Sequence, residues 1–172
     1  DFRLVLPIFE AMQETNVSGL LVENIAITSD FLDREVKVDF YLPRNVTDPS
    51  QMSLLLINDG QDLVKMNFGS ILSQLYTGEK AITPVLCAGI HCGPERKRVY
   101  GVAAEADYKG RGDKAPRYTS FIFDELVPYL RKTYSVYSFR EKAFAGFSLG
   151  GLSAMDMVWN HPGEFSKVGV FS

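Results

Sequence analysis

The chain has 172 residues, of which 46% are hydrophobic and 23% are charged, a composition typical of one globular domain with a hydrophobic core. The net charge of −3 gives no electrostatic footprint for nucleic acid, and the densest basic run, 95–98, is too short to follow a phosphate backbone. No apolar run approaches the roughly 18 residues that span a bilayer. These properties exclude disordered and fibrous proteins, and they predict neither a nucleic-acid partner nor a membrane partner.

The stretch 1–18 is expected to be a helical or irregular extension, and charged residues such as Arg3 and Glu10 exclude a signal sequence within it. The compartment stays open between the cytoplasm and export after signal cleavage, because the chain does not begin with Met. Cys87 and Cys92 are the only cysteines. Along one strand they would lie about 16 Å apart, beyond the roughly 4.4–6.8 Å of a disulfide, so we expect free thiols.

Hydrophobic periodicity predicts the elements in chain order. Strands are expected at 20–28, 34–42, 52–57, 84–91, 142–147 and 167–171, and helices at 68–76, 118–134 with a kink at Pro128, and 149–160. Alternation along 34–42 predicts a half-buried strand with Asp39 and Tyr41 on its polar side, whereas the apolar runs 52–57 and 84–91 predict fully buried strands. The stretch 92–115 has no period and is expected to be a loop.

Two antiparallel strands followed by alternating buried strands and helices indicate an α/β fold. We expect one domain over residues 1–172, with a mixed, mostly parallel sheet and helices on both faces.

Residues 146–151 read Gly-Phe-Ser-Leu-Gly-Gly, between a predicted strand and a predicted helix. The form G-x-S-x-G is that of a nucleophile elbow, and it makes Ser148 the predicted nucleophile. Side chains two positions on either side of the serine would collide, so Gly146 and Gly150 are required there, while Gly151 lets the helix approach the sheet. The alternative is a tight turn with an incidental serine.

Residues 58–62 read Asn-Asp-Gly-Gln-Asp and directly follow a buried strand, so they should lie at the same sheet edge as Ser148. The backbone N–H groups of Gln61 and Leu149 would then form an oxyanion hole. An ordinary turn is the alternative, because Asn-Asp-Gly favours turns. Asp59 and Asp62 alone do not make a metal cage, and no metal or cofactor is expected.

The motifs resemble the enterochelin-esterase-like and esterase-D-like branch of the α/β-hydrolases, which includes feruloyl esterases and mycolyltransferases. The resemblance runs from about residue 20 to the last residue and rests on segments 56–62, 123–130, 145–151, 161–165 and 168–172. It implies the α/β-hydrolase fold, with Ser148 as nucleophile and the Gln61 and Leu149 amides as oxyanion hole. In the family, the catalytic acid and histidine lie on loops after two further strands, which this sequence does not contain.

The two histidines of this chain are weak substitutes for the missing base. His161 lies 13 residues past Ser148, roughly 20 Å along a helix axis. His91 ends a strand and should face the same sheet edge as Ser148. It precedes the serine, against the usual order of the triad, so a place in the pocket wall or on the surface is favoured over catalysis. Arg96 and Tyr100 follow in the 92–115 loop. They are candidate substrate contacts, with structural ion pairing and packing as the alternative.

We therefore expect a serine carboxylic-ester hydrolase that acts on a small-molecule ester through an acyl-enzyme. The alternatives are a non-catalytic binding or interaction domain with the hydrolase fold and an acyltransferase of the same family. A final strand at 167–171 would leave an exposed sheet edge, which a second copy of the chain could cover in a homo-oligomer.

Overall fold

A seven-stranded mixed sheet organises the chain in the computed structural model, which describes residues 15–17, 19–44, 46–77, 79, 81–104, 107 and 109–172. The strand order is β1-β2-β3-β5-β4-β6-β7. The pairs β1–β2, β2–β3 and β3–β5 are antiparallel, whereas β5–β4, β4–β6 and β6–β7 are parallel. The sheet is therefore mixed, as the sequence predicts, with its parallel half formed by the last four strands.

The strands are β1 (Thr15–Val17), β2 (Leu20–Ser29), β3 (Arg34–Pro43), β4 (Ser53–Asn58), β5 (Val85–Ile90), β6 (Lys142–Phe147) and β7 (Lys167–Phe171). The α-helices are α1 (Phe68–Thr77), α2 (Arg96–Val99), α3 (Ala115–Ser120), α4 (Val127–Tyr134) and α5 (Leu149–Asn160). Two short 3-10 turns, η1 (Pro49–Gln51) and η2 (Gly60–Asp62), and a π-helical stretch, η3 (Phe121–Leu126), complete the described elements.

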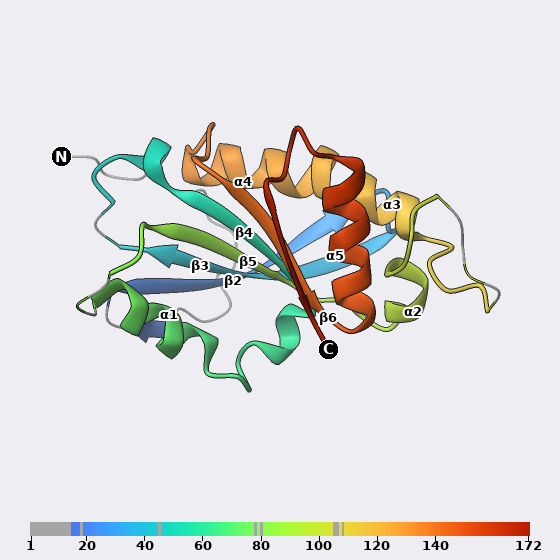
Figure 1. The fold of residues 1–172 in the computed structure, drawn as a ribbon, viewed down its shortest axis with the longest axis horizontal. Coiled ribbons are helices and arrows are strands. Elements are labelled where there is room, and N and C mark those ends of the chain that lie inside the picture. Colours follow the sequence, from blue (N-terminus) through green and yellow to red (C-terminus); the bar gives the residue numbers. More distant parts are fainter. Residues whose placement is uncertain are drawn as a thin grey trace.

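Helices cover both faces of the sheet (Figure 1). On one face, α3, η3, α4 and α5 pack on a large apolar cluster that includes Phe40, Leu56 and Phe144. On the other face, η2 and α1 cover a smaller cluster around Tyr41 and Leu72. The α/β-hydrolase arrangement expected from the resemblance is confirmed at this level.

The structure corrects three details of the expected elements. Residues 15–17, within the expected helical or irregular extension, form a strand, and 1–14 and 18 lie outside the described residues. The expected loop 92–115 contains α2 and the first residue of α3. The alternation predicted for β3 is wrong for Asp39 and Tyr41, which are buried because α1 and neighbouring polar groups cover that face.

At Pro128, where the sequence predicts a kink, the helix changes its winding. The π-helical stretch η3 precedes α4, and Pro128 lies in the first turn of α4. Proline has no N–H to donate to the carbonyl four residues earlier, and a π-helical stretch is one way a helix accommodates that loss. Both cysteines are buried free thiols, as expected.

Strand β7 forms one edge of the sheet, and apolar side chains are exposed there and on α5. Val170 and Phe171 of β7 are half exposed. Leu152, Met155 and Trp159 are exposed on α5, at the three- and four-residue spacing of one helix face, and Trp159 is 74% exposed. Among the described helices, none combines the length and the apolar character that crossing a bilayer requires.

Candidate active site

Ser148 occupies a sharp turn between β6 and α5. Its φ of 51° and ψ of −120° lie outside the regions that L-residues ordinarily adopt, and its side chain is exposed. Its backbone N–H donates a hydrogen bond of 2.7 Å to the carbonyl of Phe171 in β7. Such strain persists only where the surrounding structure imposes it, and it gathers at functional sites.

Three glycines in this turn stand where an added Cβ would meet other atoms. A Cβ on Gly146 would lie 2.4 Å from the carbonyl carbon of Gly150, and one on Gly151 would lie 2.9 Å from the carbonyl oxygen of Gly146. A Cβ on Gly150 would meet a carboxylate oxygen of Asp59 at 2.8 Å. The first turn of α5 is thus pressed against the end of β6 and against the loop after β4.

The loop after β4 is the second strained position at this edge of the sheet. Asp59 adopts the left-handed conformation, with φ 60° and ψ 42°, and is buried. Gly60 follows with its Cα against β5, where a Cβ would lie 2.2 Å from the carbonyl carbon of Gly89. Gln61 is therefore held next to the end of β4, the strand that pairs directly with β6.

The backbone N–H groups of Gln61 and Leu149 lie in the first turns of η2 and α5, where a helix leaves its amides without intrahelical partners. Within the described part of the chain, neither amide donates a hydrogen bond. They remain available for a developing oxyanion, and the N-terminus of α5 adds a favourable dipole. Their joint action as an oxyanion hole stays a prediction.

A buried polar network joins the two loops. The Asn58 side-chain amide donates to the carbonyl of Gly150 at 2.8 Å, and its Oδ1 accepts from the hydroxyl of Tyr118 at 2.6 Å. Nε and Nη2 of Arg96 each donate to the Asp59 carboxylate at 2.7 Å. Arg96 is thus engaged in an ion pair, the alternative that the sequence left open.

The structure gives Tyr100 a different place from the expected substrate pocket. Its side chain is fully buried, and its hydroxyl accepts a hydrogen bond from the backbone N–H of Asp59 at 3.0 Å. Burial first, and the nearby Asp59 carboxylate second, raise the pKa of Tyr100 well above its usual range. Tyr100 therefore stays a neutral phenol whose hydroxyl holds the backbone of the loop after β4.

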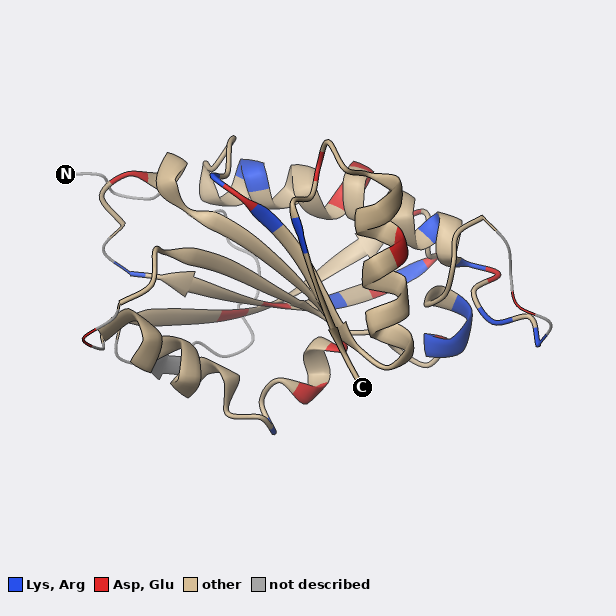
Figure 2. Cartoon of the chain, in the orientation of Figure 1, with Lys and Arg blue, Asp and Glu red and all other residues tan. Residues whose placement is uncertain are grey.

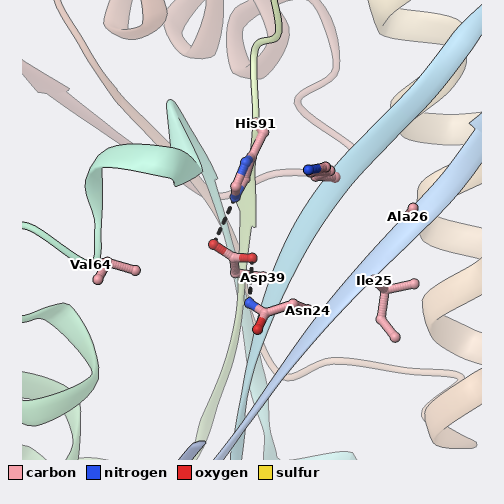
Figure 3. Close-up of a pocket in the computed structure, with 7 residues that line it drawn as sticks. Asn24, Ile25, Ala26, Asp39, Val64 and His91 are labelled. Atoms are coloured by element: carbon pink, nitrogen blue, oxygen red, sulfur yellow. Dashed lines mark hydrogen bonds and ion pairs between the residues drawn. The ribbon is translucent and has the colours of Figure 1, made fainter. Parts of the chain in front are cut away.

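His91 lines a cavity on the face of the sheet opposite α3 and α4. Its Nε2 lies 2.8 Å from Oδ2 of Asp39, whose Oδ1 accepts from the Asn24 amide at 2.7 Å (Figure 3). The cavity has a volume of about 470 Å³, and Lys37 and Val64 are also in its wall. A histidine oriented by a buried carboxylate resembles part of a catalytic triad in chemistry.

The position of this His91–Asp39 pair nevertheless separates it from Ser148. His91 points toward Asp39 on β3, and β3 lies on the far side of β5 from β4 and β6. At about 4.8 Å between strands, β3 and β6 are ~14 Å apart. Ser148 is not among the residues that line the cavity, and the His91 imidazole is engaged with Asp39 instead.

His161 is also far from the elbow, at the other end of α5. Its Nδ1 lies 2.9 Å from the carbonyl of Met157, and its ring packs against Phe123 with centroids 4.6 Å apart. The acidic residues near it in sequence, Asp156 and Glu164, are engaged with other groups: Asp156 accepts a hydrogen bond from the backbone N–H of Ala103, and Glu164 pairs with Lys142. Neither of the two histidines in the sequence is placed to accept the Ser148 proton.

Sequence reasoning missed Asp39 and Asn58 as parts of polar clusters. The alternation along 34–42 predicts a solvated face for Asp39, but its partners Asn24 and His91 are 15 and 52 residues away in the sequence. Asn58 carried a usable signal, since an amide at the end of an apolar strand must find partners once it is buried.

Comparisons with known proteins agree with the fold. The family described as "Putative esterase" matches residues 29–172. No curated protein matches the chain by sequence. An IroE-like serine hydrolase from Shewanella oneidensis is 22% identical with a TM-score of 0.71, and the match covers 86% of this chain and 49% of that one.

Two further solved structures are similar. The enterochelin esterase from Shigella flexneri is 19% identical with a TM-score of 0.68, over 90% of this chain and 37% of that one. The BES protein from Bacillus cereus is 16% identical with a TM-score of 0.73, over 96% and 65%. At these identities the likeness shows a shared fold, and the chain spans less than two thirds of each protein. The α/β-hydrolase sheet and the elbow geometry agree with the family match over residues 29–172. The chain therefore belongs to the esterase family.

Proposed function

We propose that this chain carries the nucleophile and the oxyanion hole of a serine carboxylic-ester hydrolase. The observation that carries the proposal is the strained and exposed conformation of Ser148, at φ 51° and ψ −120°, in a chain of the esterase family. A serine that only filled a turn would gain nothing from this costly backbone conformation. A nucleophile gains exposure of its Oγ together with neighbouring amide donors.

In the proposed reaction, Ser148 Oγ attacks the carbonyl carbon of a small-molecule ester and loses its proton to a general base. The negative charge that develops on the carbonyl oxygen is stabilised by the backbone N–H groups of Gln61 and Leu149. The ester C–O bond then breaks, and the alcohol leaves with a proton returned by the base. Water repeats the sequence on the acyl-enzyme and releases the acid.

The general base in this scheme lies outside the 172 residues. His91 and His161 are each engaged with other groups, away from the elbow. Since a serine hydroxyl is a poor nucleophile without a base, we expect full activity only in a polypeptide that also supplies one.

A second candidate is a non-catalytic binding domain that keeps the hydrolase fold, and the distance of both histidines from Ser148 favours it. Ester turnover that depends on Ser148 would exclude this candidate. Acyltransfer uses the same residues as hydrolysis, and product ratios with water and with an added alcohol acceptor distinguish the two.

The test is hydrolysis of p-nitrophenyl acetate by the longest natural polypeptide that contains this sequence. Ser148→Ala should lower kcat by about 10³-fold or more, as removal of a nucleophile does. Ser70→Ala is the matched control, because Ser70 is exposed on α1, on the opposite face of the sheet from α5. Equal rates for the two variants would refute the proposal.

A further inference from the structure

We propose that Arg96 is a positioning residue that holds the Gln61 amide in register with Ser148 by clamping Asp59. The inference rests on the proposed esterase function and assigns a task to a side chain that does not itself touch the reacting atoms. The clamp consists of the Arg96 guanidinium, the Asp59 carboxylate and the backbone carbonyl of Phe147.

Arg96 contacts both strained loops with one rigid group. Its Nε and Nη2 donate to the two carboxylate oxygens of Asp59, each at 2.7 Å, and Nη2 also approaches the carbonyl of Phe147 at 3.3 Å. Phe147 is the residue immediately before Ser148. The planar guanidinium therefore fixes the distance between the loop after β4 and the start of the elbow.

The clamped carboxylate belongs to a residue that has little freedom. The Asp59 side chain is 5% exposed, its backbone N–H donates to the Tyr100 hydroxyl, and its Oδ1 also lies 3.3 Å from the Gln61 side-chain nitrogen. Gln61, which provides the candidate oxyanion amide, is two residues further along. Gly60 between them is pressed against β5, so the loop has no room to absorb a shift of Asp59. Such a shift would therefore move the Gln61 amide.

A second link fixes the other side of the elbow. Asn58 donates to the carbonyl of Gly150, two residues after Ser148, while Arg96 reaches the residue before it. The two links hold the strained turn from both ends against the same loop. This arrangement is what preorganised oxyanion stabilisation requires, since the donors must already be in place when the charge develops.

Helix α2 offers a control within the same turn. Figure 2 shows the basic residues gathered on α2, which carries Arg96, Lys97 and Arg98. Arg98 also makes a two-nitrogen ion pair, with Asp113, but its side chain is 50% exposed and contacts neither the elbow nor the β4 loop. The two arginines lie on the same helix and each pairs with an aspartate, but only Arg96 also reaches the elbow.

The experiment measures kcat and KM on p-nitrophenyl acetate and the Ki of phenylboronic acid, whose tetrahedral serine adduct places an oxygen in the oxyanion hole. It uses the same natural polypeptide as the Ser148 test. Arg96→Gln should lower kcat by about 10²-fold, the loss typical of one misplaced oxyanion donor, with KM within about threefold. The Ki should rise in proportion to the fall in kcat. Arg98→Gln should leave all three within about twofold.

Arg96→Lys and Tyr100→Phe keep the test decisive if Arg96→Gln does not fold. Lysine keeps the charge but loses the fork, and phenylalanine keeps the ring but loses the acceptor for the Asp59 N–H, so each should lower kcat by about tenfold. The proposal is overturned if these variants, or Arg96→Gln, match Arg98→Gln in kcat and Ki. It is also overturned if the loss is confined to KM. If Ser148→Ala is inactive in either case, the esterase function stands without the clamp.

Discussion

The elbow region and the His91–Asp39 cluster both contain hydrogen bonds of 2.7–2.8 Å to a buried carboxylate. They differ in their backbone. Ser148 and Asp59 have positive φ, and the surrounding glycines leave no space for a Cβ. The residues of the His91–Asp39 cluster lie on or directly after regular strands, and none of them has a positive φ.

This difference separates two ways of holding a polar group. At the elbow, the backbone conformation itself is costly and depends on several neighbours at once. In the cluster, regular strand pairing fixes the backbone and the side chains add only their own hydrogen bonds. Substitutions that add atoms next to the backbone should therefore lower stability strongly at the elbow. Side-chain substitutions in the cluster should lower it only slightly.

The largest effect is expected from Gly146→Ala. The added Cβ would lie 2.4 Å from the backbone of Gly150, and neither β6 nor α5 can move without losing its packing. We expect a loss of about 3 kcal/mol or more in the free energy of unfolding, measured by urea denaturation. Gly163→Ala is the control, since nothing lies within 4 Å of its Cβ position, and it should change stability by less than about 0.5 kcal/mol. Similar losses in both variants would contradict the steric account.

Asn58→Ala should rank second. It leaves the Gly150 carbonyl and the Tyr118 hydroxyl without this partner in a fully buried position, at a cost of about 2–3 kcal/mol. Asn160→Ala is the matched control, because Asn160 also bonds a backbone carbonyl from its side-chain amide but is exposed. If thermal unfolding gives the two variants the same midpoint, the network around Asn58 does not stabilise the fold.

Asp39→Asn tests the cluster. It keeps the shape of the side chain and weakens the hydrogen bonds to His91 and Asn24, so we expect a loss of about 1 kcal/mol in stability. The kcat on p-nitrophenyl acetate should stay within about twofold of the unmodified protein, because β3 and β6 are about 14 Å apart and Ser148 does not line this cavity. A fall in kcat as large as that of Arg96→Gln would place the cluster in the catalytic machinery and end the contrast drawn above.

The smallest effect concerns the surface partner of Arg98. Hydrogen bonding to Arg98 lowers the pKa of Asp113, so its ionised form favours the folded state. That contribution is present above the ordinary pKa of an aspartate, about 3.9, and is lost as the pH falls through the lower folded value. Asp113→Asn should lower the unfolding midpoint slightly at pH 7, and the difference should shrink in acid and in 1 M NaCl, a high salt concentration that screens surface pairs. A difference that persists in acid would show that the charge is not its cause.

Most of the fold follows from the sequence, because local periodicity and turn chemistry are recorded in neighbouring residues. Residues 142–147, 149–160 and 167–171 were predicted with the bounds that the structure shows. The elbow was predictable because only glycine fits where two backbones approach this closely. Short elements such as α2 and η2 carry too few residues for a period to be visible.

The side-chain network was beyond local reasoning. Arg96 and Asp59 are 37 residues apart, and Tyr118 and Asn58 are 60 apart. Their pairing depends on which strands become neighbours, and strand order is a property of the whole chain. Asp39 shows the same limit, since the alternation in β3 could not reveal that His91 and Asn24 would cover its polar face.

Trp159 gives the molecule a built-in optical reporter. It is the only tryptophan of the chain, and it stands 74% exposed on the apolar outer face of α5, on the flank of the sheet that ends in β7. Its indole emission should shift to shorter wavelengths when a second copy or any other polypeptide settles on that flank. Titrating the protein while following this one fluorophore would therefore measure how the flank is covered, without a label and without any substrate.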